Sequence, residues 1–200
     1  MTQFHQREPD VAPNRDFPSV PNAEPFVELD RFEQEREAYA HLSHYRVCEK
    51  GVVPRCYGWL ELSPQDLTQI TSVSNASEEA RSLARYAVGP LSALLLEYFP
   101  DAVRLTQDIA TEELADIAIR GLAEIHSAYV LHGDVFTRNI LVSPDNRVIF
   151  VDFDRSATPS GKLPSRRQDL LNELSDLWSK FYVRLVSTLL VLCHRLPLNV

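Results

Sequence analysis

The chain has 200 residues, of which 44% are hydrophobic, and its 28 acidic and 20 basic side chains give a formal net charge of −8. This composition is typical of one acidic globular domain, and it disfavours nucleic-acid binding, which uses clustered Lys and Arg. Cys48, Cys56 and Cys193 are odd in number and form no Cys-x-x-Cys unit, so they indicate neither a disulfide framework nor a structural zinc site. We therefore expect an intracellular, cytoplasmic protein.

Residues 1–25 are predicted to be a disordered, proline-rich tail. Five prolines stand there among polar and charged residues, and such a composition cannot bury a core. The tail also lacks the basic, apolar and small-residue regions of a signal peptide.

A helix is predicted over residues 32–42, because four side chains at helical spacing lie along one side: Phe32, Glu35, Tyr39 and Leu42. Two interpretations of Glu35 stay open. It belongs either to a functional buried face or, with Glu33 and Glu37, to a solvated face of the helix.

Three segments follow this helix in chain order. Residues 63–87 are rich in Ser, Thr, Gln and Asn, which indicates an insertion between strands. The apolar residues 94–96 predict a buried strand that ends at the turn Glu97-Tyr-Phe-Pro. Residues 112–125 predict an amphipathic helix with Thr111 as its N-cap and acidic residues in the first turn.

Polar side chains then occur at the ends of two short strands. Residues 140–142 and 148–151 are β-prone, and the turn formers 143–146 between them predict a hairpin. Pairing the strands brings Asn139, before the first strand, beside Asp152, after the second. A hard cation such as Mg²⁺ prefers oxygen ligands of this kind, with phosphate and water completing its shell. Asp134 lies five residues before Asn139 and adds a second carboxylate.

The remaining chain predicts a surface loop and helices. Residues 155–167 are polar and contain Pro159, Gly161 and Pro164. Residues 168–192 predict one or two helices with an apolar stripe of Leu170, Leu171, Leu174, Leu177 and Trp178. The apolar run from 185 to 193 is shorter than the roughly 20 residues of a membrane span, so no span is expected.

The stretch His132-Gly-Asp134-Val-Phe-Thr-Arg-Asn139, followed by Asp152-Phe-Asp154, resembles the catalytic centre of the protein-kinase-like superfamily. The resemblance runs from about Leu91 to Thr158. It implies an α+β, protein-kinase-like fold with an incomplete N-lobe and a mainly helical C-lobe. The implied division is the tail 1–25, a partial N-lobe over 26–98 and a C-lobe over 99–200 that is truncated at its C-terminal end.

The resemblance also implies roles for the residues of this stretch. Asp134 matches the catalytic base, and His132 matches the residue that braces the turn. Asn139 and Asp152 match the ligands of Mg²⁺. Arg138 is a candidate substitute for the lysine that protein kinases carry two residues after the base, where this chain has Phe136.

For the nucleotide, the resemblance points to residues upstream of the stretch. The adenine edge of ATP would bind backbone groups near Glu97 and Phe99, with Leu96 at the back of the pocket. Glu35 matches the helix glutamate that pairs with a phosphate-binding lysine. A buried strand without a ligand would give the same pattern at residues 94–97.

The His-Gly-Asp triplet and Asp152-Phe-Asp154 are closer to the aminoglycoside- and choline-kinase branch, and to many uncharacterised fungal kinase-like proteins, than to regulated protein kinases. Regulated protein kinases carry Arg where this chain has Gly133, so switching through an activation loop is not expected. The acceptor hydroxyl could belong to a small molecule or a protein, and the sequence favours neither.

Two parts of a complete kinase are missing before residue 35. The first glycine is Gly51, so no glycine-rich loop can close over the phosphates. The lysines are Lys50, Lys162 and Lys180, all after Glu35. Three hypotheses remain: an active phosphotransferase with ATP and Mg²⁺, a pseudokinase or interaction module without turnover, and a fragment from a truncated gene model.

Overall fold

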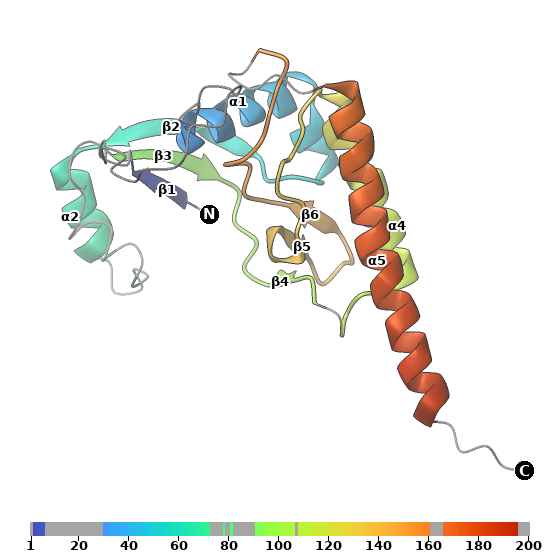
Figure 1. Cartoon of the computed structure of the whole chain (residues 1–200). Helices are drawn as coiled ribbons and strands as arrows, with labels where there is room; N and C mark the ends of the chain where they lie inside the picture. Colours follow the sequence, from blue (N-terminus) through green and yellow to red (C-terminus); the bar gives the residue numbers. More distant parts are fainter. Residues whose placement is uncertain are drawn as a thin grey trace, which may run out of the picture.

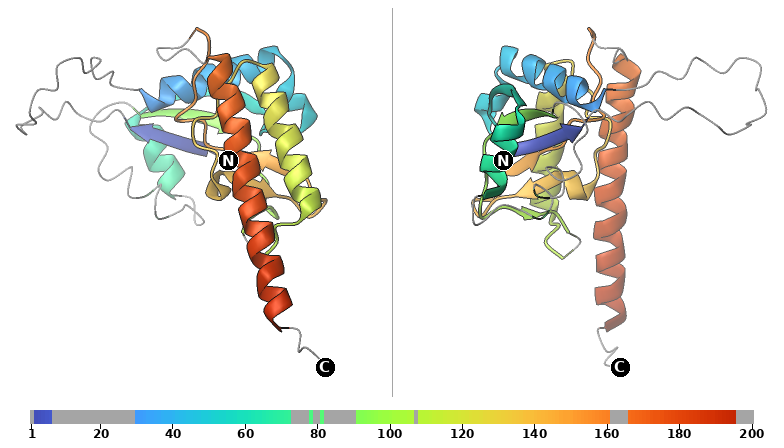
Figure 2. Two further views of the ribbon diagram at one scale, coloured as in Figure 1. Left: turned by 45° about the vertical axis from the view of Figure 1, so that its right-hand side comes forward. Right: turned by 90° about the vertical axis from the view of Figure 1, so that its left-hand side faces the viewer.

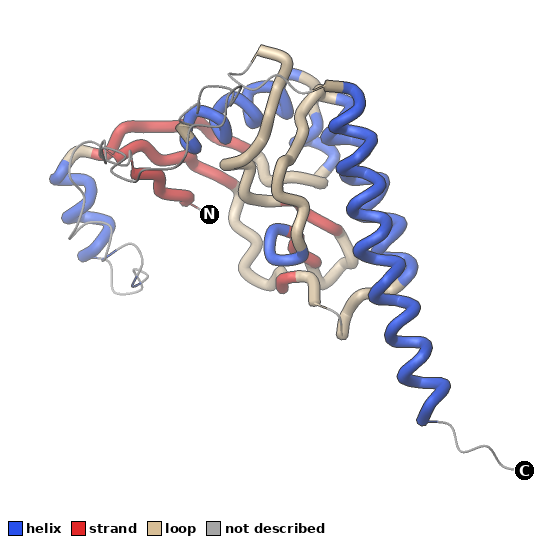
Figure 3. Tube along the Cα trace, viewed as in Figure 1, coloured by secondary structure: helices blue, strands red, loops and turns tan. Residues whose placement is uncertain are grey.

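The computed structural model describes residues 2–6, 30–72, 78, 81, 91–106, 108–160 and 166–195. Within these ranges, it describes the side chains of residues 30 to 181. The described chain contains both helices and strands, and the strands form two three-stranded antiparallel sheets (Figures 1 and 3). This mixed architecture confirms the predicted α+β class.

The first sheet has the strand order β1-β3-β2, with β3 (Leu91–Leu96) between β1 (Thr2–Gln6) and β2 (Cys56–Leu62). Strand β3 is the apolar run predicted from residues 94–96. Strand β1 differs from the prediction, because it lies inside the expected tail and pairs with β3 over its whole length. The remainder of that tail, residues 7–25, lies outside the described residues.

Helix α1 (Arg31–His44) packs against this sheet (Figure 1). Its N-cap is Asp30, whose carboxylate accepts a hydrogen bond of 3.2 Å from the Glu33 amide. The predicted face of Phe32, Glu35, Tyr39 and Leu42 is buried, together with Ala38. The solvated interpretation is therefore wrong for Glu35, which is 0% exposed.

The short helix η1 (Val47–Lys50) connects α1 to the segment before β2, and α2 (Pro64–Ser72) follows β2. Helix α2 occupies the first part of the predicted insertion over 63–87, and most of the remainder lies outside the described residues.

The second sheet contains the predicted hairpin. Strands β5 (Ile140–Val142) and β6 (Val148–Phe150) pair directly, and β4 (Val103–Arg104) adds a third strand beside β5. Ser143 closes the turn, because its amide donates to the Arg147 carbonyl at 3.0 Å and its hydroxyl accepts from the Arg147 amide at 3.1 Å. Asn146 adopts the left-handed conformation, with φ 59°, that turn asparagines tolerate.

Helices α4 (Glu112–Ser127) and α5 (Arg167–Arg195) run side by side along the second sheet (Figures 1 and 2). Helix α4 has the predicted N-cap, with Thr111 accepting from the Leu114 amide at 3.2 Å. Helix α5 is one helix of 29 residues, and its last turns extend past the rest of the described chain (Figure 2). Its predicted apolar stripe is partly wrong, because Leu171 and Trp178 are each 52% exposed.

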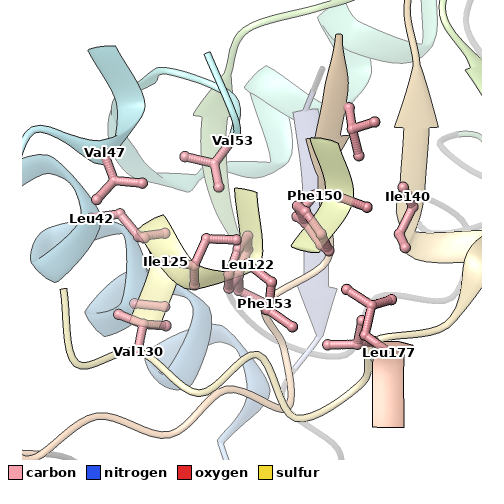
Figure 4. Close-up of a cluster of buried hydrophobic side chains, with 14 of the residues drawn as sticks. Leu42, Val47, Val53, Leu122, Ile125, Val130, Ile140, Phe150, Phe153 and Leu177 are labelled. Atoms are coloured by element: carbon pink, nitrogen blue, oxygen red, sulfur yellow. The ribbon is translucent and has the colours of Figure 1, made fainter. Parts of the chain in front are cut away.

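The larger of two hydrophobic clusters in the described residues joins α1, α4, the hairpin and α5 (Figure 4). Leu122 and Ile125 of α4, Phe150 of β6 and Phe153 are each 0% exposed, and Leu177 of α5 is 2% exposed. The core therefore fixes the hairpin against α4, and with it the loop that connects α4 to β5. None of the described helices combines the length and the hydropathy that a membrane span needs.

Candidate phosphotransfer site

The catalytic turn, defined as residues 132–139, links α4 to β5 and ends in the 3-10 helix η2 (Thr137–Asn139). Before it, Leu131 and Ala157 exchange two backbone hydrogen bonds of 2.9 Å each. Gly133 has φ +78°, and a Cβ atom at this position would overlap the carbonyl of Arg155. Only glycine fits at this position of the turn.

Glu173 of α5 holds the start of the turn. Its Oε2 accepts from the His132 amide at 3.1 Å, and its Oε1 accepts from the Gly133 amide at 2.7 Å. Its Oε2 also lies 2.8 Å from Nε2 of His126 on α4. One buried carboxylate thus joins both long helices to the backbone of the turn.

The His132 side chain points into the core. Its ring centroid lies 4.4 Å from that of Phe153, which in turn lies 5.5 Å from that of Tyr39. Burial lowers the pKa of His132, so the ring is neutral at pH 7. Nε2 carries the proton, because its partner at 3.2 Å is the Val151 carbonyl, which can only accept. His132 therefore supports the turn from beneath, in keeping with the predicted bracing role.

Asp134 lies on the catalytic turn with its carboxylate anchored on one side. Its Oδ2 accepts from Arg138 at 2.6 Å and from the Asn139 side-chain amide at 2.9 Å. Within the described residues, no hydrogen bond to Oδ1 is present. One carboxylate oxygen is thus fixed by the protein, and the other is left to accept a proton or orient a hydroxyl group.

Asn139 and Asp152 lie at neighbouring ends of the hairpin, as predicted. The Val151 amide donates to the Asn139 carbonyl at 3.0 Å, which holds the residue before Asp152 against the end of the turn. The Asn139 Nδ2 atom donates to the backbone carbonyl of Asp134 at 3.0 Å, so its Oδ1 is the atom that remains for a cation. Asp152 has φ 71°, a rare conformation for a residue other than glycine, which often marks functional sites.

This donor set fits Mg²⁺ with a nucleotide better than it fits a metal held by protein alone. An amide oxygen and a carboxylate supply part of the coordination shell, and Mg²⁺ usually takes the rest from phosphate and water. Among the described residues, no three His, Cys, Asp or Glu side chains gather into a metal-binding cluster.

Helix α1 contacts the segment after β6 at three points. The Glu35 carboxylate accepts from the Phe153 amide at 3.3 Å. The Ser156 hydroxyl donates to the Gln34 carbonyl at 3.1 Å. Arg31 pairs with Asp154 at 3.3 Å. The predicted glutamate thus lies beside the Asp152-Phe-Asp154 motif, and α1 is connected to the proposed metal site through the backbone.

The predicted adenine-binding residues lie on a separate segment at the end of β3. The Glu97 amide donates to the Arg55 carbonyl at 2.8 Å, and the Glu97 carboxylate accepts from the Arg55 amide at 3.1 Å. Leu96 is buried, and the Phe99 ring lies 6.0 Å from the Arg147 guanidinium. Because its amide is engaged, Glu97 can offer an adenine only its carbonyl.

Two residues near the turn were missed by the sequence analysis. Glu173 and Lys180 are both on α5, and Lys180 donates to the Val135 carbonyl at 2.9 Å. The available signal was spacing, since Glu173, Leu177 and Phe181 follow each other at four-residue intervals and are all buried. An acidic residue on an otherwise buried stripe indicates a partner inside the fold.

Comparison with protein families gives a match over residues 94–180, which is somewhat less than half of the chain. The family is described as the lipopolysaccharide kinase (Kdo/WaaP) family. No curated protein matches the chain. The matched range contains the catalytic turn, the hairpin, Asp152 and Glu173, and it supports a kinase-like phosphotransferase in general. The match over this region supports a place in the protein-kinase-like superfamily.

Proposed function

We propose that this protein transfers a phosphoryl group from ATP, with Mg²⁺, to a hydroxyl group of an acceptor. The observation that carries the proposal is the anchoring of Asp134 by Arg138 and Asn139, with Asn139 held beside the Asp152 segment. A carboxylate near the acceptor and oxygen ligands for the metal are what phosphoryl transfer requires of a protein, since positioning and charge supply most of its catalysis.

Each residue has a defined task in this proposal. Asp134 orients the acceptor hydroxyl and takes its proton at Oδ1, while its Oδ2 stays fixed. Asn139 and Asp152 would hold Mg²⁺, which neutralises charge on the phosphates when bound. Glu97 and Phe99 would meet the adenine edge through their backbone, and Leu96 would line the back of that pocket. Glu35 would keep the Asp152 segment in place through the Phe153 amide.

The acceptor class is the open part of the proposal. The matched family is named for kinases of a lipopolysaccharide, so a saccharide hydroxyl is the first small-molecule acceptor to test. A protein hydroxyl is the alternative within the same chemistry.

A pseudokinase is the second candidate, and the sequence before Glu35 favours it. That part contains neither a glycine nor a lysine. Loss of one preorganised electrostatic contact commonly lowers a rate by about 10²–10³. A protein that binds nucleotide and turns it over very slowly, or one that acts through protein contacts alone, would have the same fold.

The proposal is tested by thermal melting of the whole chain with and without Mg²⁺ and ATP. Ligand at about a hundred times Kd should add roughly 2.7 kcal/mol of stability, or several degrees in Tm. The variant Asp152→Asn should lose this shift. Asp154→Asn is the matched control, because that carboxylate pairs with Arg31, and it should keep the shift.

A magnesium-dependent shift that Asp152→Asn abolishes would support the nucleotide site, and transfer of labelled phosphate to saccharide and protein hydroxyls would then be measured. A cooperative melt without any shift would reject the nucleotide site and favour an interaction module. An equal loss in both variants would show that the effect is not specific to the Asp152 carboxylate.

A further inference from the structure

Two cationic side chains meet at one aromatic ring on the catalytic turn. The guanidinium carbon of Arg138 lies 4.5 Å from the ring centroid of Phe136, and the ammonium nitrogen of Lys180 lies 4.1 Å from the same centroid. Phe136 is 46% exposed, so this group of three residues is open to solvent and to a ligand. Phe136 directly follows Asp134 and Val135 in the chain.

The charge of Lys180 is not compensated. Arg138 donates to the Asp134 carboxylate, which offsets its charge. Lys180 instead donates to a neutral carbonyl, that of Val135, and none of the carboxylates in the described residues forms an ion pair with it. An ammonium has three N–H donors, and the Val135 carbonyl uses one of them. Two donors and a positive charge are therefore available beside the turn.

Helix α5 fixes this ammonium in position. Glu173, seven residues earlier on the same helix face, holds the His132 and Gly133 amides at the start of the turn. Leu177 and Phe181 pack into the core on either side of Lys180 in sequence. The spacing between Lys180 and the turn is thus set by buried contacts, and a ligand does not have to order a long surface side chain.

We propose that Arg138 and Lys180, which both contact the Phe136 ring, form a binding site for a phosphate group next to Asp134. The inference rests on the proposed phosphotransfer function, because an enzyme with this function must bind a phosphate group. The phosphate is either the group in transfer or one that the acceptor already carries. The same positive charges repel cationic acceptors, so choline and aminoglycosides are disfavoured despite the resemblance to their kinases.

Inorganic phosphate is the probe, titrated into the isotope-labelled whole chain without nucleotide while the Phe136 ring signals are followed by NMR. We expect saturable shifts in the natural chain. Lys180→Gln removes the charge but keeps an amide donor for the Val135 carbonyl, and it should weaken phosphate binding by about tenfold or more. Lys180→Arg should retain binding. Lys50→Gln, which removes a surface lysine paired with Glu124, should bind as the natural chain does.

Absence of saturable Phe136 shifts in the natural chain, or equal affinity in Lys180→Gln, would overturn the proposal. Should Lys180→Gln fail to fold, Arg138→Gln provides the same comparison and should also bind phosphate more weakly. Because this titration needs neither ATP nor turnover, its failure is distinct from a failure of the melting experiment with Mg²⁺ and ATP.

The source of the phosphate is identified by repeating the titration with Mg²⁺ and ATP, at a concentration that raises Tm. Displacement of inorganic phosphate by ATP assigns the site to the group in transfer. Simultaneous binding assigns it to a phosphate on the acceptor.

Discussion

The catalytic turn and the first sheet, which would cover the nucleotide, differ in how many of the groups needed for phosphoryl transfer they contain. The turn is held at both ends and at Asp134: Glu173 binds its first two amides, Arg138 and Asn139 anchor one oxygen of Asp134, and the Val151 amide binds the Asn139 carbonyl. The segment before Glu35 contributes strand β1 to the sheet, but its sequence contains no glycine and no lysine. In the proposed function, the side that would hold the acceptor and Mg²⁺ is thus fixed by protein contacts, whereas the segment before Glu35 offers neither a glycine nor a lysine to the nucleotide phosphates.

Mutations in the two regions should change the stability of the protein by different amounts. Contacts in the turn are buried and shared, so loss of one leaves other polar groups without partners in a region of low dielectric. Contacts that connect α1 to the Asp152 segment include an ion pair whose arginine is 59% exposed, and solvent screens such pairs. We therefore expect large effects at the turn and a small one at the exposed ion pair of α1.

Replacement of Glu173 should have the largest effect. Glu173→Ala leaves the His132 and Gly133 amides and His126 without their shared acceptor, and it should lower the free energy of unfolding by about 3–5 kcal/mol. Urea unfolding followed by circular dichroism measures this change. Glu124→Ala is the control, since that carboxylate is 42% exposed and pairs with Lys50, and it should cost less than about 1 kcal/mol.

Equal effects of Glu173→Ala and Glu124→Ala would contradict this prediction, because the turn would then not depend on α5. Glu173→Gln tests the role of the carboxylate more closely. The amide keeps one oxygen acceptor for the backbone amides and should retain part of the stability that the alanine variant loses.

Much of the turn and hairpin was predictable because the signals are local. The β-prone runs around residues 143–146 predict the hairpin, and the hairpin alone brings Asn139 beside the Asp152 segment. The spacing of Leu114, Ala118, Leu122 and Ile125 similarly predicts α4 and its buried face. Helices and hairpins that depend on contacts between residues close in sequence can be predicted from the sequence.

The parts that were missed depend on contacts distant in sequence. Glu173 lies 40 residues from Gly133, and Lys180 lies 45 residues from Val135, and no local pattern gives such distances. Strand β1 was missed because a short polar strand has little β signal of its own and is formed by pairing with β3. The exposure of Leu171 and Trp178 was missed since a stripe of leucines does not reveal which side of α5 faces α4.

The buried, neutral His132 predicts a pH dependence of stability that belongs to the turn. Burial lowers its pKa in the folded state, and the neighbouring Glu173 opposes this shift without cancelling it. Below the ordinary histidine pKa of about 6.5, the unfolded chain binds a proton that the folded chain does not. The contribution of His132 to stability is therefore complete above about pH 6.5 and is lost as pH falls towards the folded-state pKa, at up to roughly 1.4 kcal/mol per pH unit.

Urea unfolding at several values between about pH 5 and 7 measures this slope. His132→Gln keeps a donor for the Val151 carbonyl but does not titrate, so its free energy of unfolding should depend less steeply on pH than that of the natural chain. Identical slopes would show that His132 becomes protonated in the folded state, and the turn would then be more open than its contacts indicate.

The smallest effect is expected at the ion pair between Arg31 and Asp154, on the α1 side of the comparison. A double-mutant cycle with Arg31→Gln and Asp154→Asn isolates the coupling between the two side chains, since both replacements remove the charge and keep a polar side chain. The pair is partly exposed, so its coupling energy should be about 0.2–1 kcal/mol and should decrease with added salt. A coupling above about 2 kcal/mol, insensitive to salt, would mean that α1 is held to the Asp152 segment as firmly as Glu173 holds the turn. In that case α1 would be a rigid support for the Asp152 segment, which the proposed function needs to hold Mg²⁺ in place.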